Sequence, residues 1–120
     1  MRFAIAYKNA VIGHSKLEGG DPPMGVAFGD FIATENFKAF RKTAPVQNVD
    51  DEHRIWEGLD LIPPNQARVE DIVGVTVAEY GPRGAPFAIE VTCFGIAYPK
   101  YGELFPHHVA AYEAQFPPAK

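Results

Sequence analysis

Apolar and polar residues alternate along several short stretches of the chain, which is the period-two pattern of strands with one buried face. At the beginning of the chain, for example, Phe3, Ile5 and Tyr7 alternate with smaller residues. The pattern predicts strands over residues 2–7, 24–33, 72–80 and 87–96, and a weaker extended segment over residues 10–17. The loop GPRGAP, residues 81–86, joins the last two strands most simply as an antiparallel hairpin.

A glycine- and proline-rich stretch, GGDPPMGVAFGDF, covers residues 19–31. A loop that binds phosphate needs a helix N-terminus behind it, usually with a Lys, Ser or Thr at a fixed offset. Here the residues that follow alternate as a strand does. We therefore expect a sharp turn that leads into a strand, with glycines that let another element lie close.

Two helices are expected. Phe37 and Phe40 lie three residues apart, which predicts a helix over residues 35–43 with Thr34 as its N-cap. Pro106 can open a last helix because its missing N–H would have no partner there. The apolar stripe of this last helix consists of Phe105, Val109, Tyr112 and Phe116.

The order of these elements predicts an α+β fold, an antiparallel sheet of four to five strands with two helices packed on one face. The chain has 120 residues, the size of one ordinary domain. We therefore expect a single domain over residues 1–120.

The charge balance is mildly acidic, with 15 Asp and Glu against 11 Lys and Arg and a net charge of −4. It argues against a nucleic-acid partner, which needs a clustered basic surface. Lys38, Arg41 and Lys42 form the one small basic cluster, which we interpret as the solvated face of a helix. The chain contains neither an apolar run long enough for a membrane span nor a start typical of a secretory signal. These features predict a cytoplasmic protein without a membrane partner.

Residues with catalytic or metal-binding potential are few, and their spacing favours structural roles. Cys93 shares a strand face with Ile89 and Val91, so we expect it in the core. His107 and His108 are adjacent rather than four apart, which predicts an exposed first helical turn instead of a metal site. We therefore predict no catalytic residue, no metal and no cofactor.

The most informative segment is NVDDEHRIWEGLD, residues 48–60, which has no sustained period and holds the one tryptophan. It is interpreted either as a solvated loop with Trp56 tucked into the core, or as an interface in which Trp56 is an aromatic anchor among acids. The candidate partner-binding residues are Asp50, Asp51, Glu52, Trp56, Glu57 and Asp60.

In size, acidity and lack of a catalytic motif, the chain resembles the small bacterial immunity proteins that neutralise a toxin by binding it. The resemblance implies a non-enzymatic inhibitor whose acidic surface docks on a basic toxin domain and blocks its active site or locks its shape. It implies no cofactor.

Two alternatives remain open. The first is a small enzyme or ligand-binding domain with a pocket between sheet and helices, lined by aromatic residues such as Phe28, Phe94 and Tyr112. The second is a structural subunit of a homo-oligomer that pairs through an exposed sheet edge.

Overall fold

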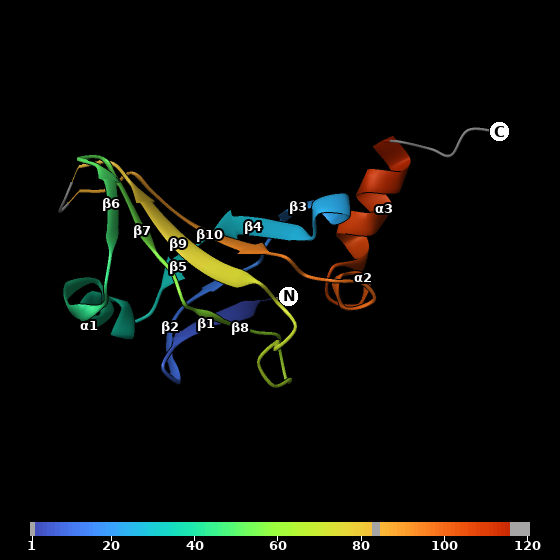
Figure 1. Cartoon of the computed structure of the whole chain (residues 1–120), viewed down its shortest axis with the longest axis horizontal. Coiled ribbons are helices and arrows are strands. Elements are labelled where there is room, and N and C mark those ends of the chain that lie inside the picture. Colours follow the sequence, from blue (N-terminus) through green and yellow to red (C-terminus); the bar gives the residue numbers. More distant parts are fainter. Residues whose placement is uncertain (1, 83–84, 116–120) are drawn as a thin grey trace.

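Strands dominate the computed structural model, which describes residues 2–82 and 85–115 (Figure 1). Within these residues a four-stranded and a six-stranded antiparallel sheet are formed. The α+β class is confirmed, but the expected single sheet of four to five strands is wrong.

The smaller sheet has the strand order β5-β2-β1-β8. Its central pair, β1 and β2, is joined at Lys8 and Asn9, which both adopt positive φ values (48° and 68°). The strands are β1 (Phe3–Tyr7), β2 (Ala10–Ser15), β5 (Ile32–Ala33) and β8 (Asp60–Ile62).

The larger sheet has the strand order β3-β4-β10-β9-β7-β6. Its centre is the predicted hairpin, in which Val77 of β9 lies opposite Val91 of β10. The strands are β3 (Gly19–Asp21), β4 (Val26–Asp30), β6 (Gln47–Asp50), β7 (His53–Trp56), β9 (Gly74–Tyr80) and β10 (Ala88–Phe94).

The strand expected over residues 24–33 is divided between the two sheets. β4 pairs with β10, whereas β5 pairs with β2, so the chain changes sheet at Phe31. The Phe31 side chain is buried and lies against Gly13, where any larger residue would collide with its ring. This crossing is the local reason why one predicted strand belongs to two sheets.

The glycine- and proline-rich stretch contains the expected turn, but Gly19–Asp21, which precede it, form the unexpected strand β3. Residues Pro22–Met24 form a short 3₁₀ helix, η1, which ends at Gly25 with a positive φ of 65°. A Cβ atom at Gly25 would lie 2.6 Å from the carbonyl oxygen of Ile96. Only glycine combines this backbone conformation with so close a neighbouring chain.

The helices are α1 (Asn36–Thr43), α2 (Lys100–Leu104) and α3 (Pro106–Gln115). Figure 1 shows α1 and α3 at opposite ends of the molecule, α1 beside β2 and α3 beside β3. The expectation that two helices cover one face of a sheet is therefore wrong. The expected Thr34 cap is also absent, because the Thr34 hydroxyl donates to the Val11 carbonyl (2.8 Å).

The buried side chains form a cluster that takes residues from both sheets and from the helices. Phe3, Val91 and Phe105 are members, and Cys93 is fully buried as predicted. Of the stripe expected on the last helix, Phe105 is buried, Tyr112 is exposed, and Phe116 lies outside the described residues. In the described part of the chain, no helix is long and apolar enough to cross a membrane.

Candidate functional site

The acidic segment expected to be a loop is largely a β-hairpin. β6 and β7 pair in antiparallel fashion, with Asn48 opposite Arg54 and Asp50 opposite His53. β6 forms one edge of the larger sheet, and all four of its residues are exposed. The strands are too short, and β6 too polar, to show a hydrophobic period in the sequence.

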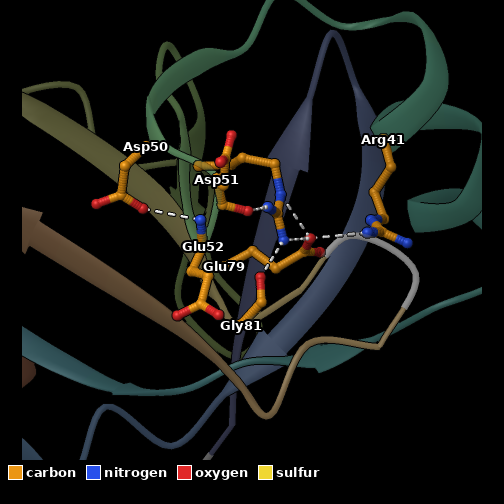
Figure 2. Close-up of polar contacts among 7 residues, drawn as sticks. Arg41, Asp50, Asp51, Glu52, Glu79 and Gly81 are labelled. Atoms are coloured by element: carbon orange, nitrogen blue, oxygen red, sulfur yellow. Dashed lines mark hydrogen bonds and ion pairs between the residues drawn. The ribbon is translucent and has the colours of Figure 1, made fainter.

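Three carboxylates lie at the turn of this hairpin. Asp50, Asp51 and Glu52 are all exposed, and we call these three residues the acidic tip. Asp50 Oδ1 accepts a hydrogen bond from the Glu52 N–H (2.8 Å), and the Glu52 carbonyl accepts one from the Gly81 N–H (2.8 Å). The backbone of the acidic tip is therefore held from within, as Figure 2 shows, and also by Gly81 of the neighbouring β9–β10 connection.

A buried ion pair lies directly beneath the acidic tip. Arg54 and Glu79 are 4% and 0% exposed, and the Arg54 Nε and Nη2 donate to Glu79 Oε1 at 2.9 and 2.6 Å. Arg54 also donates to the carbonyls of Asp51 (3.1 Å) and Gly81 (3.0 Å). The same guanidinium thus connects the tip backbone to the core.

A second arginine reaches the same carboxylate from α1. Arg41 Nη2 donates to Glu79 Oε1 at 2.7 Å, as Figure 2 shows. The Arg41 side chain is 34% exposed, so this contact closes the ion pair from the solvent side. Two guanidinium groups therefore share one buried carboxylate.

The sequence reasoning missed Arg54 and Glu79, although a signal for Glu79 was present. Val75, Val77 and Glu79 lie at alternate positions of β9, and all three are buried. An acid on the apolar face of a strand needs a cation, since an unpaired buried charge is costly. The pattern thus indicated a buried partner, but not which of the arginines supplies it.

Trp56 lies in the core, which answers the question that the sequence left open. Its side chain is 2% exposed and packs against Phe40 and Phe37 of α1, with ring centroids 5.8 and 6.1 Å away. Trp56 therefore fixes the inner face of the hairpin, and its ring is not exposed to a partner.

The remaining candidates, Glu57 and Asp60, lie beyond the other end of β7, and Asp60 is the first residue of β8 in the smaller sheet. Glu57 is separated from Glu52 by the length of β7, about 16 Å for five extended residues. Asp60 pairs with Arg68 at 3.7 Å, and both lie with Glu57 around a surface hollow of about 490 Å³. The structure thus brings Asp50, Asp51 and Glu52 together but leaves Glu57 and Asp60 apart from them.

The aromatic residues of the alternative pocket are dispersed. Phe94 lines the hollow near Asp60, Tyr112 lines another beside His108, and Phe28 is 40% exposed on β4. These three aromatic residues therefore do not line one common pocket.

His108 is buried, so the expectation that it is exposed is wrong. It stacks on Phe105 at 4.9 Å, its Nδ1 lies 3.1 Å from the Tyr101 hydroxyl, and Gly20 of β3 leaves room for its ring. Burial is the main cause that lowers the pKa of His108. Among the residues that the structure describes, no three His, Cys, Asp or Glu side chains are grouped as a metal site requires.

Comparisons of the chain with family models, with curated proteins and with solved structures gave no match. The resemblance to immunity proteins therefore stays a prediction, and the function is inferred from the geometry of the site.

Proposed function

We propose that the protein is a non-enzymatic binding protein whose acidic tip docks on a basic surface of a protein partner. The observation that carries the proposal is the position of three exposed carboxylates on an edge hairpin that is hydrogen-bonded to a buried ion pair. Such a tip presents negative charge in a conformation that needs little further ordering on binding.

The kind of partner follows from the charge. Exposed carboxylates attract a basic surface over distance and accelerate its encounter, while they repel acidic competitors. An immunity-type inhibitor that covers a basic toxin domain would use the tip in this way. Glu57 and Asp60 would extend the contact toward the other end of β7, and Trp56 would support the hairpin from inside.

The test compares association rates after charge reversal. The variant is Asp50→Asn, Asp51→Lys and Glu52→Lys, in which the amide introduced at position 50 keeps an oxygen that can accept from the backbone N–H of residue 52. A matched control makes the same change of net charge at three exposed acids away from the tip: Glu103→Lys, Glu113→Lys and Asp71→Asn. The ligand is the protein that copurifies with the wild-type chain, and association is measured at two salt concentrations.

We expect the tip variant to associate about tenfold more slowly at low salt and to lose most of its salt dependence, since electrostatic steering contributes about 10-fold or more. The control should associate nearly as the wild type does, and both variants should melt close to it because exposed charges stabilise little. If no protein partner copurifies, or if tip and control variants associate equally fast, the proposal is wrong.

A further inference from the structure

A basic hollow lies on the inner side of the same hairpin, between α1 and β7. Its volume is about 310 Å³. The residues that line it are Lys38, Arg41, Lys42, Val46, Arg54 and Trp56. We call it the basic hollow; it contains the cluster that the sequence indicated only as a solvated helix face.

Positive charge exceeds negative charge around the basic hollow. Of its four cations, the two arginines share a single carboxylate, that of Glu79. Lys38 and Lys42 are exposed, stand four apart on α1 and therefore project from the same side of the helix. Among the described residues neither lysine forms an ion pair.

Two buried donors at the basic hollow also lack a partner. The Trp56 Nε1 and the Arg41 Nε are both shielded from solvent and form no hydrogen bond within the described chain. Buried donors are satisfied in the great majority of cases, so each such exception requires an explanation. Both residues line the basic hollow, and an anion bound there would reach these N–H groups once the side chains that cover them move.

We propose that the basic hollow binds a small dianion through a phosphate group. A phosphate offers several acceptor oxygens and two negative charges, which match the ammonium and guanidinium groups that line the basic hollow. The volume lies at the lower end of the range for ligand pockets, which suits an ion as small as inorganic phosphate or the phosphate group of a small phosphomonoester. This site is distinct from the acidic tip and does not depend on the proposed function.

Trp56 supplies the readout, because it is the one tryptophan of the chain and lines the hollow. Its fluorescence is followed while inorganic phosphate, or glycerol phosphate in a second arm, is titrated in at constant ionic strength. Chloride at the same ionic strength is the reference. We expect a saturable change of emission with a phosphate probe and none with chloride.

The variant Lys38→Gln/Lys42→Gln removes two cations without touching the Arg54–Glu79 pair, and Lys16→Gln at another exposed lysine is the matched control. We expect the double variant to bind about tenfold more weakly, which corresponds to about 1.4 kcal/mol, and the control to bind as the wild type does. A thermal melt without phosphate checks that each variant is folded.

Saturation by inorganic phosphate assigns the site to the free ion, and saturation by glycerol phosphate alone assigns it to phosphomonoesters. Either result supports the proposal if the double variant weakens binding. The absence of a saturable change with both probes would overturn it. Equal affinity of the double variant and the wild type would overturn it too.

Discussion

Replacement of Glu79 by Gln tests the importance of the buried ion pair under the acidic tip. The side chain keeps its size but loses the charge that faces two guanidinium groups, with Arg54 only 4% exposed. Removing one partner of a buried ion pair costs about 3–5 kcal/mol, because the other charge stays buried without compensation. Glutamine still offers a carbonyl acceptor, so we expect a loss near the lower value, about 3 kcal/mol.

The corresponding change in melting temperature is large. In a domain of this size, each kcal/mol lowers Tm by about 4 °C, so Glu79→Gln should melt about 12 °C below the wild type. The matched variant Arg41→Gln removes the partly solvated partner, 34% exposed, and should cost about 1 kcal/mol or less because solvent screens that contact. Thermal melts followed by circular dichroism measure both variants.

A third variant distinguishes charge from packing. Arg54→Met combined with Glu79→Leu removes both buried charges, so it should be more stable than Glu79→Gln if an uncompensated guanidinium is the cause of the loss. If Glu79→Gln melts within about 4 °C of the wild type, or if it equals Arg41→Gln, the ion pair does not stabilise the fold as we argue.

Two further predictions concern single titratable groups. Burial raises the pKa of the Cys93 thiol to about 12, so we expect thiol reagents to label it slowly in the native protein and rapidly in denaturant; fast native labelling would show an accessible thiolate. Burial lowers the pKa of His108 below its ordinary value of about 6.5, so the unfolded chain binds more protons and the folded state loses stability as the pH falls below about 6.5. The Tm of the wild type should therefore fall more steeply than that of His108→Gln between about pH 7 and about pH 5, whereas equal slopes would contradict a depressed pKa.

The strands could be predicted from the sequence better than their partners. Alternation placed β1, β9 and β10 correctly, because each buries one face over five residues or more. Alternation carries no information on which strands pair. The division of the chain between two sheets at Phe31 therefore could not be predicted from the sequence. β6, β7 and β8 were missed because strands of three or four residues are too short for a clear period.

The candidate site was predicted in part, for a similar reason. The exposed acids Asp50, Asp51 and Glu52 are adjacent in the sequence, so their grouping was visible there. The ion pair below them joins residues 25 positions apart, and no local pattern selects Arg54 as the partner of Glu79. The burial of Trp56 depends on α1, whose docking against the hairpin is likewise a tertiary contact.

The strand order of both sheets has a consequence for folding during synthesis. β1 pairs with β8, and β4 pairs with β10, although each pair is far apart in the sequence. Ile5 lies opposite Leu61, and Gly29 lies opposite Val91. Bringing such distant segments together costs chain entropy before any stabilising contact between them has formed, and this slows folding. On the ribosome, β1 with β2 and β3 with β4 would emerge as isolated pairs, which are marginally stable in water. The larger sheet can close only after β10 has left the exit tunnel, so β3 and β4 must stay apart from β6, β7 and β9 until then.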